Sequence, residues 1–242
     1  MVNKKITKAF FKRNFELTTA EKKLLDDFTV VVQIDWLASI KPENSNIVAC
    51  VHEQSVYEEV VIISVQTGDT CFDKDKQKIA ELIQKYIPYH ILLCIHNDNF
   101  LVLNTCDKRV NQNDATKRFM ERQYFTEKIS IKSPTERQKS FTNSLSFPAL
   151  NKQNMKTIYD AYSARIIALQ AAEVIGTFTI RHNERSKQDV QYLENIARLH
   201  SEISALQNQA INETQLNVRI QMNTAVQQIK KEIKKLEELI ST

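Results

Sequence analysis

Three acidic residues lie in segments rich in β-branched side chains, which are typical of strands: Asp35, Glu58 and Glu59. Carboxylates gathered on neighbouring strands could hold Mg²⁺ against a phosphate while a lysine steadies the nucleophile. An acid followed two residues later by a lysine occurs only at Glu21 and Glu232, and both pairs fall in helical patterns. A metal-dependent nuclease is therefore the third and least supported hypothesis. The sequence leaves any catalytic residue unknown, and we predict no metal site.

Thiol and imidazole groups also meet on one predicted strand, where His90, Cys94 and His96 share a face through period-two spacing. His90 lies four residues from Cys94, which is too far along a strand for both to ligate one ion. The chain has four widely spaced cysteines without a CxxC pair: Cys50, Cys71, Cys94 and Cys106. This spacing argues against a structural zinc site and a disulfide framework.

Nucleotide-cofactor loops need several glycines so that backbone amides can approach a phosphate, and the chain has only two glycines, Gly68 and Gly176. Dinucleotide and Walker-type sites are therefore excluded. The serine-hydrolase elbow, the HExxH helix and the kinase signatures are also missing from the sequence. We predict no cofactor.

Basic residues are the remaining candidates for binding. The amino-terminal arm carries five of them before the first acidic residue, Glu16: Lys4, Lys5, Lys8, Lys12 and Arg13. A second basic stretch contains Lys117, Arg118 and Arg122. With a net charge of +4, these side chains could follow a nucleic-acid backbone, although solvated surface charge explains them as well.

The residues up to 131 predict a mixed α/β domain that positions these groups. Thr18 and Glu21 have capping-box spacing, which predicts a helix at about 19–27. Strands are expected at about 28–40, 57–66, 90–96, 100–105 and 118–128, with a helix from Asp73 to Pro88. The segment 90–96 is apolar almost throughout, as in a strand covered on both faces. The expected sheet has about five strands with packed helices.

A polar segment with two prolines, 132–152, predicts a linker or long loop between two domains. Residues 153–242 form the second region, which begins with a predicted helix at about 153–173.

The last 56 residues contain two apolar series with heptad spacing. The series differ in phase, and a turn near 209–212 would separate them. They predict an antiparallel coiled-coil hairpin with helices at 187–209 and 213–240, although strict alternation from Leu216 to Met222 would also suit a short strand. The expected interface residues are Ile196, Leu199, Ile203, Leu206, Val226, Ile229, Ile233 and Leu236.

Three segments of the chain are IDWLASIKP at 34–42, IPYHILLCI at 87–95 and QLNVRIQMN at 215–223. Together they resemble one bacterial family of uncharacterised proteins, domain of unknown function 4391. Members are often encoded beside restriction-modification methylases and helicases, so the resemblance implies an antiviral-defence setting and no catalytic residues. The family usually has an apolar residue or proline at the position of His90, which argues against a shared role for this histidine.

These observations favour a non-catalytic accessory subunit that docks through exposed parts of its hairpin onto a protein partner such as a methylase or helicase. Homo-oligomerisation stays open. The alternative is a nucleic-acid-binding module that uses the basic arm. The sequence has no run of about 18 apolar residues and no leader pattern at its start, so we expect a cytoplasmic protein without a membrane segment.

Overall fold

The computed structural model describes residues 4–27, 29–52, 55–111, 114–181 and 183–241, without the side chains of 114–117 and 183. The chain forms two compact units, Met1–Ile166 and Ile167–Thr242. In chain order the elements are β1 (Lys4–Lys5), α1 (Lys8–Asn14), α2 (Thr19–Asp26), β2 (Gln33–Ile40), α3 (Pro42–Ser45), β3 (Cys50–His52), β4 (Ser55–Tyr57), β5 (Val60–Gln66), α4 (Phe72–Tyr86), β6 (His90–His96), β7 (Phe100–Asn111), β8 (Asp114–Phe125), β9 (Ile129–Ser130), α5 (Glu136–Ser144), a 3₁₀ turn (Phe147–Ala149), α6 (Met155–Ile175), α7 (Asn183–Asn212) and α8 (Leu216–Ser241).

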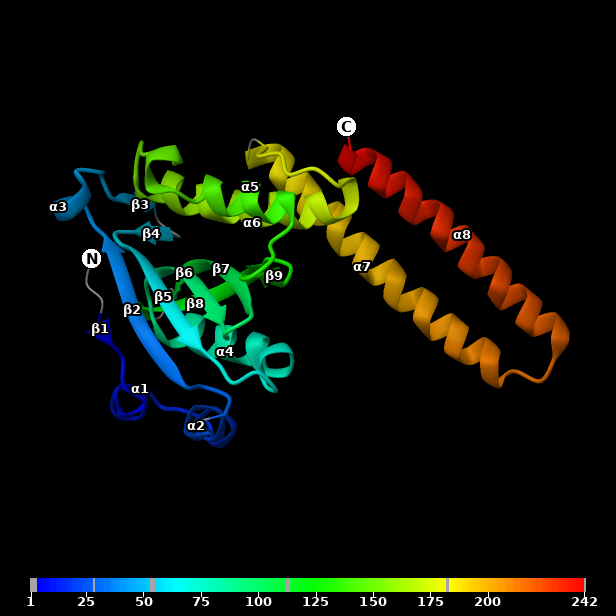
Figure 1. The fold of residues 1–242 in the computed structure, drawn as a ribbon, viewed down its shortest axis with the longest axis horizontal. Helices are drawn as coiled ribbons and strands as arrows, with labels where there is room; N and C mark the ends of the chain where they lie inside the picture. Colours follow the sequence, from blue (N-terminus) through cyan, green and yellow to red (C-terminus); the bar gives the residue numbers. More distant parts are fainter. Residues whose placement is uncertain (1–3, 28, 53–54, 112–113, 182, 242) are drawn as a thin grey trace. The chain divides into compact units, whose positions relative to one another are not determined.

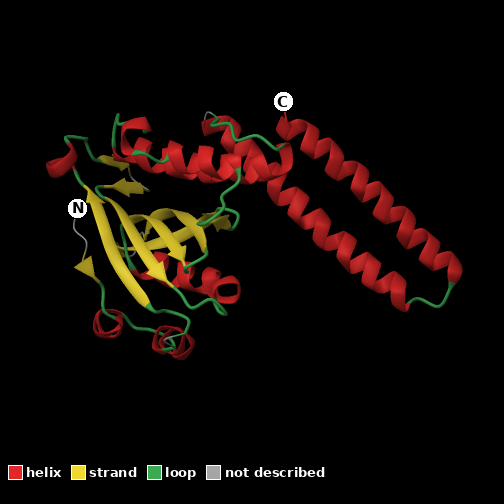
Figure 2. Ribbon diagram, viewed as in Figure 1, coloured by secondary structure: helices red, strands yellow, loops and turns green. Residues whose placement is uncertain are grey.

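A mixed sheet organises the first unit (Figures 1 and 2). Its strands follow the order β1-β2-β5-β6-β7-β8, and β9 also pairs with β7. Only β5 and β6 pair in parallel among the described strands, because the crossover between them is the helix α4. The side chains of β6 are buried or half-buried along the whole strand, in agreement with its apolar sequence.

The predicted sheet of about five strands was too small, since seven strands are described in it. The additional strands, β1 and β9, have two residues each, so they are too short for a sequence period to appear. The predicted strand at 57–66 is divided: β4 ends at Tyr57 and pairs with β3 in a separate two-stranded sheet, and β5 begins at Val60.

Local sequence signals account for the helices beside the sheet. The capping box of Thr18 and Glu21 begins α2, and both hydrogen bonds of the box are formed. The apolar stripe of α4 buries Ile79, Leu82 and Ile83 in the core of the unit, and Pro88 follows its end.

The predicted linker at 132–152 contains ordered structure in the first unit. Thr135 and Gln138 form a second capping box at the start of α5, and Phe141 of this helix is fully buried. The division between the two units falls inside α6, between Ile166 and Ile167. The polar segment predicted as a linker therefore contains a capped helix, α5, that is held by one buried apolar side chain, Phe141. The helix predicted at 153–173 corresponds to α6.

The second unit contains two long helices that lie side by side in opposite directions (Figures 1 and 2). Arg181, which precedes α7, and Arg185, in the first turn of α7, donate hydrogen bonds to the carbonyl oxygens of Ile240 and Leu239, at the end of α8. Both arginines also contact the buried carboxylate of Asp189. Residues 213–215 connect the helices, so the turn predicted near 209–212 was placed too early, because α7 continues to Asn212. The segment from Leu216 is helical and not a strand.

Among the described residues, no helix is long and apolar enough to cross a membrane.

Candidate functional site

A cleft of roughly 700 Å³ opens beside the edge strand β1 in the first unit. Its walls combine lysines with aromatic side chains. The lining residues are Lys4, Lys5, Ile6, Thr7, Phe10, Trp36, Ser39, Lys41, Asn44, Glu59 and Tyr89. This pairing of positive charge with exposed aromatic rings is the composition used to bind nucleotides of single strands.

A β-bulge in β2 brings Trp36 and Ser39 to the same cleft. Side chains three residues apart point to opposite faces of a regular strand. The pairing of β2 with β5 shifts register between Trp36 and Ala38, and this extra residue changes the alternation. The indole Nε1 of Trp36 then donates a 2.7 Å hydrogen bond to Ser39 Oγ. The ring of Tyr89 stands edge-on to Trp36, with centroids 6.1 Å apart.

The turn after β2 fixes the third lysine of the cleft. Asn44 accepts a hydrogen bond from the backbone amide of Lys41 and donates one to the carbonyl oxygen of Ser39. Asn46 closes the short helix α3 in the left-handed conformation, which asparagine tolerates well. The Lys41 ammonium lies 3.3 Å from Oε2 of Glu59, whose side chain is only 6% exposed.

A smaller cavity of roughly 190 Å³ adjoins the cleft, since Glu59 and Tyr89 line both. His90 and Arg118 are among its other walls. The imidazole of His90 is stacked on Tyr57 with centroids 3.8 Å apart, and it meets the edge of Tyr159 at 4.8 Å. Burial, together with the positive charges of Lys108, Arg118 and Lys156, lowers the pKa of His90 to about 3. This histidine is therefore neutral at physiological pH.

Lys108 holds the segment between α4 and β6 in place. Its ammonium donates 2.8 Å hydrogen bonds to the carbonyl oxygens of Ile87 and Tyr89. Burial lowers the pKa of this lysine to about 7. Lys108 thus positions the backbone of Tyr89 at the wall shared by the cleft and the cavity.

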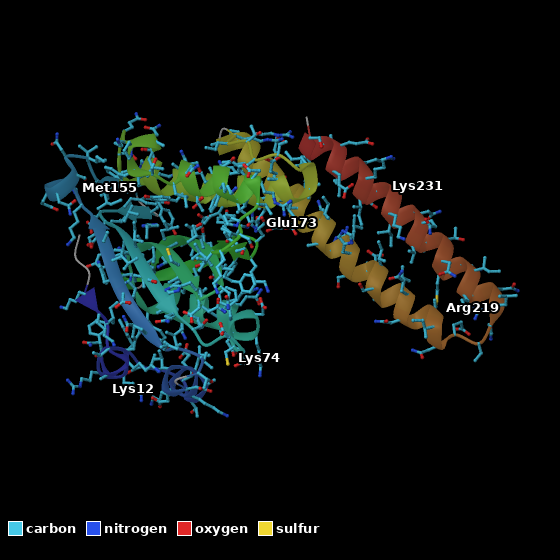
Figure 3. The ribbon with its side chains drawn as sticks, viewed as in Figure 1. Lys12, Lys74, Met155, Glu173, Arg219 and Lys231 are labelled. Atoms are coloured by element: carbon cyan, nitrogen blue, oxygen red, sulfur yellow. The ribbon has the colours of Figure 1, made fainter. Side chains whose placement is uncertain are left out.

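The predicted basic residues divide into separate groups. Lys4 and Lys5 line the cleft, and Arg118 lines the adjoining cavity. Lys12 of α1, labelled in Figure 3, forms an ion pair with Asp26. The remaining members are Lys8, which is half-buried, Arg13, which is exposed on α1, and Arg122, which lies opposite Asp107 in the β7–β8 pairing. The side chain of Lys117 lies outside the described residues.

The acidic residues of the nuclease hypothesis are not gathered. Asp35 pairs with Ser64 in the middle of the sheet, whereas Glu59 precedes Val60, the partner of Ile40. Asp35 lies five residues along β2 from Ile40, the residue beside the Glu59 end of β5, which corresponds to about 16 Å. Glu58 is exposed, and Gln33 donates two hydrogen bonds to Asp35. No group of three or more acidic, histidine or cysteine side chains suited to a metal is found in the described part of the chain.

The eight predicted hairpin residues belong to one apolar cluster of the second unit. Five are buried and three are partly buried against the cluster: Ile196, Leu199, Ile203, Val226 and Ile233 form the first group, and Leu206, Ile229 and Leu236 form the second. Their burial is explained within the chain. The seams therefore offer little surface to a partner.

Sequence analysis missed the aromatic residues and the third lysine of the cleft: Phe10, Trp36, Lys41 and Tyr89. Trp36 and Lys41 belong to the segment 34–42 and Tyr89 to the segment 87–95, two of the segments that carry the family resemblance. These residues show no regular spacing in the sequence that would mark a binding motif. Strand pairing and the bulge in β2 bring them together. The only available signal was the unusual position of a tryptophan inside a half-buried strand.

The fold and the cleft define a mixed α/β protein with a basic, aromatic surface site and a pair of long C-terminal helices. The chain belongs to the family described as domain of unknown function (DUF4391), whose model matches residues 1–233. This confirms the resemblance found in the sequence. No curated protein and no solved structure matches the chain.

Replacing His90 by phenylalanine is expected to make the fold less sensitive to acid. The folded pKa of about 3 lies below the ordinary value of 6.5, so the unfolded state binds more protons between these values. Wild-type stability should therefore fall relative to His90→Phe by about 1 kcal/mol per pH unit from pH 6 to pH 4. Phenylalanine keeps the stack on Tyr57.

Urea unfolding at several pH values measures this difference. His200→Gln is a suitable control, because His200 is exposed on α7. Parallel curves for wild type and His90→Phe would contradict the assignment of a neutral buried imidazole.

Proposed function

We propose that this chain is a non-catalytic accessory protein that binds single-stranded nucleic acid along the cleft beside β1. The observation that carries the proposal is the lining of one cleft by three lysines and three aromatic rings, those of Phe10, Trp36 and Tyr89. Lysines contact phosphates without regard to sequence, and aromatic faces stack on bases that are not paired.

The charges of the cleft support this proposal. Lys4 and Lys5 are exposed, and the hydrogen bond from Lys5 goes to Gln33, which is neutral. Asp35 lies opposite Lys5 in the β1–β2 pairing and accepts hydrogen bonds from Gln33, so one negative charge is close to Lys5. Both lysine side chains are nevertheless exposed and can reach a phosphate. Lys41 forms an ion pair with Glu59, and its side chain is still 46% exposed.

The aromatic residues favour a single strand over a duplex. Phe10 and Tyr89 are exposed large side chains, and Trp36 is half-buried beside them. A base that stacks on these rings must leave its own stack, which costs little in a single strand. In a duplex the rings would meet only the sugar-phosphate backbone.

Charge reversal of the edge strand tests the proposal. Lys4→Glu/Lys5→Glu should weaken binding of a dC12 oligonucleotide at least about tenfold, because two phosphate contacts become repulsive. Fluorescence anisotropy measures the affinity. Lys22→Glu/Lys23→Glu changes the net charge equally at exposed positions of α2 and should have little effect. Equal losses in both variants would show that only overall charge matters, and unchanged affinity in Lys4→Glu/Lys5→Glu would rule out the cleft.

A second candidate function is docking onto a larger protein through the tip of the α7–α8 pair. Three large apolar side chains are exposed around this turn: Ile211 is 79% exposed, Leu216 60% and Ile220 53%. Arg219, labelled in Figure 3, lies in the same first turns of α8. Exposed apolar patches of this kind are typical of interaction surfaces. A methylase or helicase subunit would cover the tip while the coiled-coil seam stays inside the pair.

The family setting suits either function. An accessory protein of a bacterial defence complex would hold displaced single strands or recruit the enzyme that acts on them. In both cases this chain would bind the nucleic acid or the partner protein, and the partner enzyme would catalyse the reaction.

A further inference from the structure

Among the described residues that line the cleft, Glu59 is the only acidic one. Its side chain is only 6% exposed, and Oε2 is the oxygen that faces Lys41 at 3.3 Å. Its other oxygen, Oε1, is buried and has no hydrogen-bond partner among the described residues. A buried carboxylate oxygen without a donor is costly, so such a group calls for an explanation from its function.

The chemistry of Glu59 selects a donor group from the ligand. A carboxylate only accepts hydrogen bonds, and its last torsion is soft enough to turn Oε1 toward the cleft. Adenine, cytosine and guanine present exocyclic amino groups, which donate. Thymine and uracil present an imide N–H between two carbonyl oxygens, and a carboxylate repels those oxygens.

The surroundings of Glu59 suit a base attached to a phosphate. Trp36 and Tyr89 offer aromatic surface in the same cleft. Lys41 lies beside the carboxylate, and Lys4 is paired with Trp36 across the β1–β2 strands, so positive charge flanks the aromatic surface. A stacked base and its phosphate would therefore meet complementary groups at the same time.

We infer that the cleft holds one unstacked nucleobase with an exocyclic amino group, which donates a hydrogen bond to Oε1 of Glu59. This inference rests on the proposed binding of single strands and adds base selectivity to it. Lys41 pairs with the carboxylate through Oε2, and the aromatic rings supply the stacking surface.

Matched pyrimidine oligonucleotides test the inference, because dC12 and dU12 differ at the group that Glu59 would read. At pH 7.5 the wild type should bind dC12 about tenfold more tightly than dU12, as one charge-assisted hydrogen bond allows. Glu59→Gln should reduce this ratio to below about threefold, because an amide can both donate and accept. Glu58→Gln is the control, since Glu58 is the exposed neighbour and does not line the cleft.

The outcomes separate the two claims. Equal binding of dC12 and dU12 by the wild type would overturn the base recognition and leave the single-strand proposal intact. No binding of either oligonucleotide would overturn both. The free nucleotide CMP should compete at least tenfold more weakly than dC12, since it lacks the neighbouring phosphates for Lys4 and Lys5; equal competition would support the base site and contradict the strand. The wild-type ratio decides the question even if Glu59→Gln does not fold.

Discussion

Leu199→Ala is expected to lower the free energy of unfolding of the helical unit by about 3 kcal/mol. Leu199 is almost fully buried in the cluster between α7 and α8, so its truncation loses apolar contact and leaves a cavity. Helices joined only along a narrow seam have few other contacts that could compensate. Urea unfolding followed by circular dichroism measures the loss, since these two helices contain a large share of the helical residues.

Leu216→Asp is the matched comparison at the tip of the same helices. Because Leu216 is exposed, this change should alter stability by less than about 0.5 kcal/mol. If the tip docks onto a partner, a tagged Leu216→Asp protein should lose a methylase or helicase that wild type retains through a salt wash. A large stability loss in Leu216→Asp, or a small one in Leu199→Ala, would contradict the assignment of seam and tip.

Tyr159→Phe is expected to cost about 2–3 kcal/mol of stability in the first unit. The Tyr159 hydroxyl accepts a 2.8 Å hydrogen bond from the backbone amide of Cys106 and lies 2.9 Å from the carbonyl oxygen of the same residue. The carbonyl oxygen of Ile91 is 3.3 Å away. Removing the hydroxyl takes a hydrogen-bond partner away from the buried backbone amide and carbonyl group of Cys106 in β7, while the ring stays unchanged.

Tyr162→Phe provides the control on the same helix. Tyr162 is also buried, but no hydrogen bond of its hydroxyl group is found among the described residues. Its replacement should change the urea midpoint little. Equal effects of the two substitutions would show that ring packing, and not the hydroxyl of Tyr159, connects α6 to the sheet.

Local patterns predicted the elements that depend on local interactions. The capping box at Thr18, the apolar run of β6 and the heptad spacing of α7 and α8 are visible within one segment of sequence. Each of these patterns depends on contacts that a segment makes within itself or with one neighbouring helix or strand. For this reason α7, α8 and β6 were predicted close to their observed bounds, whereas the strand expected at 57–66 is divided between two sheets.

The cleft could not be predicted, because nonlocal pairing creates it. Lys4 meets Trp36 only through the pairing of β1 with β2, and the bulge in β2 decides which side chains share a face. Lys41 and Glu59 come together because β2 and β5 are neighbours in the sheet. Two lysines of the basic arm, Lys4 and Lys5, line the cleft, whereas its other members are not among the lining residues.

The most direct test of the cleft is the salt dependence of dC12 binding by the wild-type protein. Three cleft lysines that each neutralise one phosphate predict a slope of about −2 in a plot of log affinity against log salt concentration. A slope near that value, lost in Lys4→Glu/Lys5→Glu and kept in Lys22→Glu/Lys23→Glu, is the result we expect. A slope near zero, or the absence of binding at low salt, would contradict the proposal that this protein holds single-stranded nucleic acid.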